Sequence, residues 1–106
     1  MSETVAKIRA LVSDGKVLVS AHGYEELAAD VIYFSEIPDG LADTAVIEDY
    51  PAASKGSSVL VLQKDGDGRP VHVVWGIPGG KPKPAVTAYR PDPKKWTGDF
   101  MKRKQQ

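Results

Sequence analysis

The stretch of sequence from Ser58 to Ile77, SVLVLQKDGDGRPVHVVWGI, decides the fold. Two apolar runs, Ser58–Lys64 and Val71–Ile77, flank the residues 65–68, DGDG. Tight hairpins need positive φ angles that glycine and aspartate tolerate, so these four residues predict a hairpin turn. Because Val71–Ile77 is apolar at both sets of alternating positions, we expect a central strand covered on both faces.

Two further strands are predicted on either side of this hairpin. Residues 45–50 alternate in polarity and end at Pro51, and residues 84–90 follow a turn that contains Pro78, Gly79 and Gly80. Strands joined by short turns pair antiparallel, so the four form a meander. The predicted strands lie near 45–50, 58–64, 70–77 and 84–90.

The first half of the chain predicts helices. A first helix between Ser2 and Gly15 has apolar residues at helical spacing. A second, over 21–29 with Ser20 as its N-cap, places Tyr24, Leu27 and Ala28 on one face, and Ser35 is a candidate cap for a short helical turn. Helices beside a meander give an α+β fold, with N-terminal helices packed on a four-stranded antiparallel sheet.

Composition places the chain among ordinary globular domains. It has 106 residues, so we expect one domain over 1–106. It has no cysteine, which excludes disulfides and thiolate metal sites and fits a reducing compartment. No apolar run approaches the roughly 18–20 residues that cross a bilayer, and the N-terminal sequence lacks the apolar core of a secretory signal. We therefore expect a cytoplasmic protein with no membrane contact.

Charge is distributed unevenly although the net charge is zero. Residues 17–54 carry eight acidic side chains and no lysine or arginine, whereas residues 81–106 carry eight basic side chains and two acidic ones. Such asymmetry attracts phosphates or a charged partner. The alternative is that the two halves fold together and neutralise each other.

Two histidines are candidates for chemistry. His22 falls in the first turn of the predicted second helix, where backbone N–H groups and the helix dipole favour the neutral imidazole that a general base needs. His72 lies in the predicted central strand. For each there is a structural alternative: a helix-start histidine bonded to nearby backbone, and a half-buried histidine paired with a local acceptor. The sequence has no Walker loop, dinucleotide-binding glycine pattern or metal-ligand spacing, so we expect no cofactor and no metal.

The segment 89–96, YRPDPKKW, is the most distinctive chemical motif. Its two prolines hold the backbone extended, so that one tyrosine, one arginine and two lysines project in a defined order. A basic and aromatic cluster binds single-stranded nucleic acid through phosphate pairing and base stacking. The structural alternative is a brace at the sheet edge, in which Trp96 and Phe100 pack and the cations extend into solvent.

Four short motifs occur in a characteristic order. They are residues 19–22 (VSAH), 46–51 (VIEDYP), 67–74 (DGRPVHVV) and 88–96 (AYRPDPKKW). Together they resemble a bacterial family catalogued as a domain of unknown function and grouped with the RelE-like and BrnT-like toxins. The resemblance covers about residues 17–104.

This resemblance implies a RelE-like fold and an action on RNA, either binding or metal-independent cleavage of messenger RNA, with an antitoxin-like protein as partner. It implies catalytic roles for His22, Tyr89 and Arg90, and nucleic-acid binding by His72, Lys94 and Lys95. The alternative function is a non-catalytic interaction module whose acidic half or basic tail binds a protein. The sequence leaves open whether the protein forms a homo-oligomer.

Overall fold

The computed structural model describes residues 3–13, 17, 19, 21–52, 56–77 and 84–104, without the side chains of Ala21 and His22. The predicted helix signals at Ser2, Gly15 and Ser20, and the turn at 78–80, lie outside these residues. None of the helices in the described part of the chain has the length and apolar character needed to span a bilayer.

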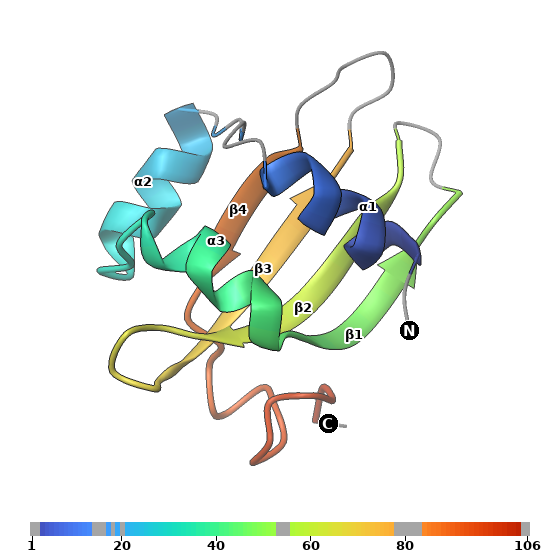
Figure 1. Cartoon of the computed structure of the whole chain (residues 1–106). Coiled ribbons are helices and arrows are strands. Elements are labelled where there is room, and N and C mark those ends of the chain that lie inside the picture. The colour runs from blue at the N-terminus through green and yellow to red at the C-terminus, as the bar shows by residue number, and fades with distance from the viewer. Residues whose placement is uncertain are drawn as a thin grey trace.

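A four-stranded antiparallel sheet forms the centre of the molecule (Figure 1). Its strands lie side by side in chain order, as the alternation of polar and apolar residues predicts. The third and fourth strands are each shorter than predicted by one or two residues. The strands are β1 Ala45–Tyr50, β2 Ser58–Lys64, β3 Pro70–Gly76 and β4 Ala85–Tyr89.

The turn between β2 and β3 confirms the predicted hairpin. The Asp65 N–H donates to the Arg69 carbonyl, and the Gly68 N–H donates to the Asp65 carbonyl, each at 3.0 Å. Gly68 has a φ of 79°, which a residue with a side chain adopts only under strain. The Asp65 carboxylate accepts further hydrogen bonds from the Asp67 and Arg69 N–H groups, both at 2.9 Å. Glycine thus supplies the backbone shape, and aspartate holds it.

In the part of the chain that the structure describes, three helices lie over one face of the sheet (Figure 1). A short 3₁₀ turn, Leu41–Asp43, leads from the third helix into β1. Ser35 precedes the third helix as predicted, but its side chain makes no capping hydrogen bond. The helices are α1 Glu3–Val12, α2 Ala21–Ala29 and α3 Glu36–Gly40.

The core lies between these helices and the sheet. Val59, Val61, Val73 and Trp75 are fully buried there. Burying apolar surface stabilises the fold by roughly 25 cal/mol per Å². Further members of the core are Val5, Ile8, Leu27, Ile32, Ile37, Leu41, Val71, Val86 and Ala88.

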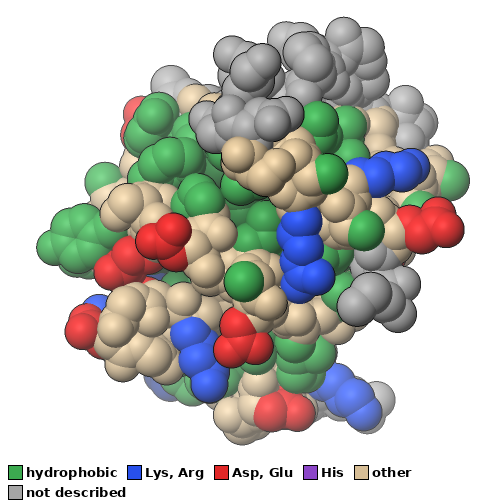
Figure 2. Space-filling view, in the orientation of Figure 1, with side chains coloured by type: hydrophobic (Ala, Val, Ile, Leu, Met, Phe, Trp, Pro, Cys, Tyr) green, Lys and Arg blue, Asp and Glu red, His purple; other side chains and the backbone are tan. Residues whose placement is uncertain are grey.

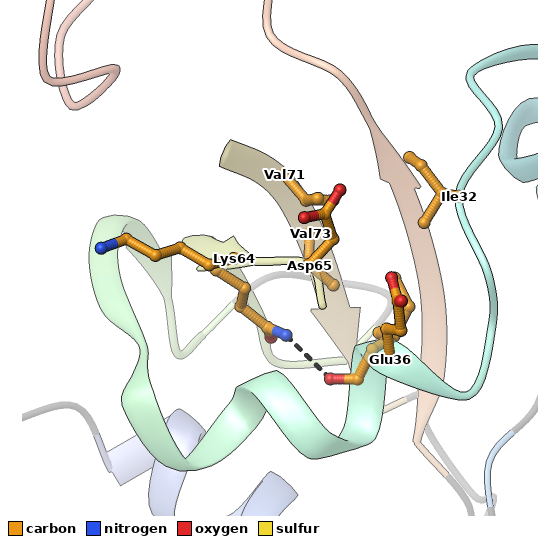
Figure 3. A pocket seen from close by; sticks show the side chains of 8 residues that line it. Ile32, Glu36, Lys64, Asp65, Val71 and Val73 are labelled. Carbon is orange, nitrogen blue, oxygen red and sulfur yellow. Dashed lines mark hydrogen bonds between the residues drawn. The ribbon is translucent and has the colours of Figure 1, made fainter. Parts of the chain in front are cut away.

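One buried polar side chain joins three elements of this core. Gln63 of β2 donates through its amide nitrogen to the Ile37 carbonyl of α3 (2.8 Å) and accepts from the Trp75 indole (2.9 Å). Figure 3 shows the end of the core where this bond lies, with Ile32, Val71 and Val73 around a cavity of about 10 Å³. Because the Gln63 amide both donates and accepts a hydrogen bond, its burial leaves neither its nitrogen nor its oxygen unsatisfied.

The three residues that the sequence places on one face of α2 differ in burial. Leu27 is buried, but Tyr24 is 56% exposed and Ala28 is exposed. The helix instead turns Gly23 and Leu27 inward.

Candidate functional site

The sheet face turned away from the helices, here called the distal face, carries the candidate site. Side chains alternate along β3, so that Val71, Val73 and Trp75 enter the core and His72 lies on the distal face. Tyr89 of β4 pairs with His72 in the register and therefore shares this face.

The chain beyond β4 folds into a small hairpin, here called the basic hairpin, residues 92–104. Trp96 and Arg103 form an antiparallel bridge between its two arms. The Thr97 N–H donates to the Lys102 carbonyl, and the Lys104 N–H donates to the Lys95 carbonyl, each at 2.8 Å. The residues after β4 therefore have a defined shape despite their high charge.

His72 attaches the basic hairpin to the sheet. Its Nε2 lies 2.8 Å from the Phe100 carbonyl, and its Nδ1 lies 3.3 Å from the Tyr89 hydroxyl. A carbonyl oxygen only accepts, so Nε2 carries the hydrogen and Nδ1 accepts from tyrosine. The Trp96 ring packs edge-on against the imidazole, with ring centroids 4.3 Å apart. Burial lowers the pKa of His72 below its ordinary value of 6.5, which favours this neutral form.

His72 has an acceptor, as the structural alternative predicts, but that acceptor is the Phe100 carbonyl 28 positions away, and the side chain is fully buried rather than half-buried. Trp96, at 6% exposure, packs as expected for a brace, whereas Phe100 contributes its backbone carbonyl to the attachment. The contact with nucleic acid predicted for His72 stays a prediction, and it would require the basic hairpin to move.

A second attachment joins the basic hairpin to β1. Arg103 forms an ion pair with Glu48 and lies over the Trp96 ring, 4.9 Å from its centroid. Glu48 also accepts a hydrogen bond from the Tyr50 hydroxyl. The hydrogen bond from Tyr50, followed by the one from Arg103, lowers the pKa of Glu48 below its ordinary value. A continuous chain of contacts thus runs across the distal face, from Trp96 through Arg103 and Glu48 to Tyr50.

The basic hairpin carries five cationic side chains, two of them predicted as nucleic-acid ligands. Lys94 and Lys95 are exposed on the first arm. The two acidic residues of the hairpin hold its backbone: Asp92 accepts from the Lys94 N–H (2.9 Å), and Asp99 accepts from the Met101 N–H (3.1 Å). The five cationic residues are Lys94, Lys95, Lys102, Arg103 and Lys104.

Arg90, predicted as catalytic, points into a network at the end of β4. Its guanidinium lies 2.7 Å from the carboxylate of Asp65, whose side chain is only 3% exposed. It also donates to the carbonyls of Pro70 (3.3 Å) and Val31 (3.4 Å). Burial opposes ionisation of Asp65, but hydrogen bonds from Arg69 and Arg90 outweigh it and lower the pKa of this carboxyl.

The three residues predicted as catalytic occupy different environments. His22 lies in the first turn of α2, as predicted, but its side chain is outside the described part of the structure. Tyr89 is half-buried beside His72, and burial raises the pKa of its hydroxyl. Tyr89 and Arg90 therefore share a strand end but bond to different partners, and their catalytic roles stay predictions. No group of three or more acidic or histidine side chains among the described residues is placed to hold a metal ion.

Glu48, Tyr50 and Arg103 were not predicted as site residues. The period of two along β1 could have placed Glu48 and Tyr50 on one face of the sheet. Nothing in the local sequence reveals that Arg103, 55 positions after Glu48, returns to pair with it.

Comparison with known proteins gives a family. Searches of the curated proteins and of the solved structures each returned no match to the chain. The family model described as "Domain of unknown function (DUF4258)" matches residues 19–90, which include α2, α3 and all four strands and end before the basic hairpin. Because this match covers more than half of the chain, the protein belongs to the DUF4258 family.

Proposed function

We propose that this protein is a cytoplasmic RelE-like domain of the toxin superfamily that binds single-stranded RNA with its basic hairpin and the adjoining distal face. One observation carries the proposal: five cationic side chains sit on a hairpin that His72, Trp96 and Glu48 hold against the sheet. Cations on a pre-ordered backbone pair with phosphates at a smaller entropic cost than cations on a disordered tail.

An aromatic side chain lies near one of these cations, Arg103. Tyr50 is 48% exposed, and its hydroxyl bonds to Glu48, the partner of Arg103. An exposed ring next to a basic strip suits base stacking combined with phosphate pairing, the usual mode of single-stranded nucleic-acid binding. The choice of RNA rests on the resemblance to RelE-like toxins.

Binding has stronger support than cleavage. Arg90 is paired with the buried carboxylate of Asp65, and Tyr89 bonds to His72. Cleavage would rest on His22 as the general base that deprotonates a ribose 2′-hydroxyl. In this proposal RNA binding is the primary activity, and cleavage is a separate step that His22 would supply.

Anisotropy of a fluorescently labelled single-stranded RNA, measured over a salt series, tests the binding. We expect log K to fall with log salt with a slope of about −0.7 for each phosphate contact, because each contact releases a counterion. Lys94→Ala combined with Lys95→Ala should flatten the slope by about 1.4. Lys7→Ala combined with Lys64→Ala removes the same charge from exposed sites outside the hairpin and should leave the slope unchanged.

Incubation of the same RNA followed by denaturing electrophoresis tests cleavage. If His22 is the base, His22→Ala abolishes cleavage and leaves the binding constant unchanged. Absence of RNA retention at low salt, or equal effects of the two lysine pairs, would overturn the proposed binding site. Retention without cleavage by the wild-type protein would restrict the function to binding.

A further inference from the structure

The outward face of α2 is unusually apolar for an exposed helix face. Among the α2 side chains that the structure describes, the exposed ones are Tyr24, Glu25, Ala28 and Ala29, so a single charge accompanies three apolar residues there. Surface helices normally present charged and polar side chains to solvent. Figure 2 shows hydrophobic side chains gathered on this flank of the molecule, over α2 and the turn after it.

The end of α2 extends this apolar face. The Ile32 N–H donates to the Leu27 carbonyl (2.9 Å), and the Val31 N–H donates to the Ala28 carbonyl (3.2 Å). This pair of bonds is the Schellman motif, whose left-handed position is usually occupied by glycine. Here Val31 occupies it, with a φ of 53°.

Valine at this position is strained, and its own side chain is mostly exposed rather than buried. A β-branched residue at positive φ is a conformational outlier. The side chain of Val31 is nevertheless 63% exposed, so it gains little from packing within its own chain. Strain of this kind concentrates where a side chain must be presented to a ligand or partner.

Val31 and its neighbours form a stripe, here called the α2 patch: Tyr24, Ala28, Val31 and Tyr33. Tyr24 and Ala28 are spaced i and i+4, which places them on one side of the helix, and Val31 follows at the left-handed position just beyond the helix end. Tyr33, just beyond the helix end, is 67% exposed. A stripe with this spacing is the surface against which a second helix packs.

The charge around the α2 patch is acidic. Residues 23–33, which cover the described side chains of α2 and the turn after it, include Glu25, Glu26 and Asp30 and no lysine or arginine, and Glu25 lies exposed beside Tyr24. A cation, Arg90, does reach the patch, because it donates to the Val31 carbonyl. It also forms an ion pair with Asp65 at 2.7 Å, which offsets its charge. An occupant of the patch therefore meets an apolar stripe with a negative border.

We propose that the α2 patch docks a short amphipathic helix of a partner protein, with apolar residues on one side and lysine or arginine at its borders. The patch is too small for a stable dimer, which buries about 800 Å² on each partner. Its three large side chains together expose roughly a few hundred Å², the area that one helical segment covers. The acidic border selects a basic segment.

A labelled Leu/Lys peptide of about 14 residues, with leucine at helical spacing, is the probe. Fluorescence anisotropy at low salt should show binding by the wild-type protein. The same peptide with glutamate in place of lysine should not bind, because it meets like charge. A peptide of the same composition with scrambled leucine positions should bind at least about tenfold more weakly, because its apolar side chains no longer align.

Val31→Gly and Tyr33→Ser should each weaken binding of the Leu/Lys peptide by about tenfold. Val31→Gly relieves the left-handed strain, so its melting temperature should equal or exceed that of the wild type, and its lost affinity cannot be ascribed to unfolding. Val46→Ser is the matched control, because Val46 is also exposed but lies on β1. Its affinity should be unchanged.

Peptide binding unaffected by Val31→Gly and Tyr33→Ser, or equal binding of the scrambled peptide, would overturn the proposal. So would concentration-dependent self-association of the free protein that Val31→Gly abolishes, which would make a second copy the occupant. RNA binding provides an independent readout: Lys94→Ala with Lys95→Ala should leave peptide affinity unchanged, and Val31→Gly should leave RNA affinity unchanged.

Discussion

At the scale of single residues, the contact between Arg90 and Asp65 links several elements. It joins the end of β4 to the turn between β2 and β3, and the same guanidinium reaches the end of α2 through the Val31 carbonyl. Removing one member of a largely buried ion pair leaves the other charge poorly solvated. Arg90 thus holds three elements together.

The depressed pKa of Asp65 makes this contact sensitive to acid. The ordinary value is 3.8, and the folded value is lower, so the ionised carboxylate stabilises the fold above pH 4 and that contribution is lost as the pH falls through the folded pKa. Asp65→Asn should lower the free energy of unfolding at pH 7 by about 1.5–3 kcal/mol, the scale of a hydrogen bond to a charged group.

Urea denaturation of both proteins between pH 7 and pH 2 measures this difference, which should shrink below about pH 4. Asp67→Asn is the control, because the Asp67 side chain is 82% exposed, and it should change stability little at any pH. A difference between wild type and Asp65→Asn that stays constant down to pH 2 would contradict the role given to the carboxylate.

At the scale of elements, the basic hairpin depends on its one large buried anchor. Trp96 is 6% exposed and packs against both His72 and Arg103. Trp96→Ala should lower the free energy of unfolding by about 3–5 kcal/mol, the usual cost of truncating a buried aromatic. Lys94→Ala, on the same arm but exposed, should cost less than about 0.5 kcal/mol. Thermal and urea denaturation measure both, and equal effects of the two substitutions would show that the tryptophan is no anchor.

At the scale of the whole molecule, the two faces of the sheet differ in how much of the chain packs against them. Helices α1, α2 and α3 cover the inner face of the sheet. In the described part of the structure, the basic hairpin covers the distal face and is attached to it through a few side chains. Regions with few buried apolar contacts open locally, without global unfolding. The two faces should therefore differ in stability.

Amide hydrogen exchange measures this difference. We expect the amides of Val61 and Val73, in the central strands, to exchange only by global unfolding. The amides of Thr97 and Lys104, which close the basic hairpin, should exchange faster through local opening, and Trp96→Ala should accelerate them further. Equal protection of the hairpin and the central strands would show instead that they unfold as one unit.

The four strands, their antiparallel order and the turn at residues 65–68 could be predicted from the sequence. Each depends on interactions between residues close in the chain: alternating polarity along a strand, and the positive φ that Gly68 adopts. The α2 helix followed in the same way from its capping position and composition. Local signals of this kind are independent of the final packing, and therefore they survive in the structure.

Which helix face turns inward, and which charges meet, was decided by the tertiary structure alone. Leu27 rather than Tyr24 enters the core, since helical spacing identifies neighbours on a helix but not the side that the sheet will cover. The partner of Arg90 lies 25 positions away, and that of Arg103 lies 55 positions away. Such pairs form only once the strands have brought distant segments together, because no local preference links residues so far apart.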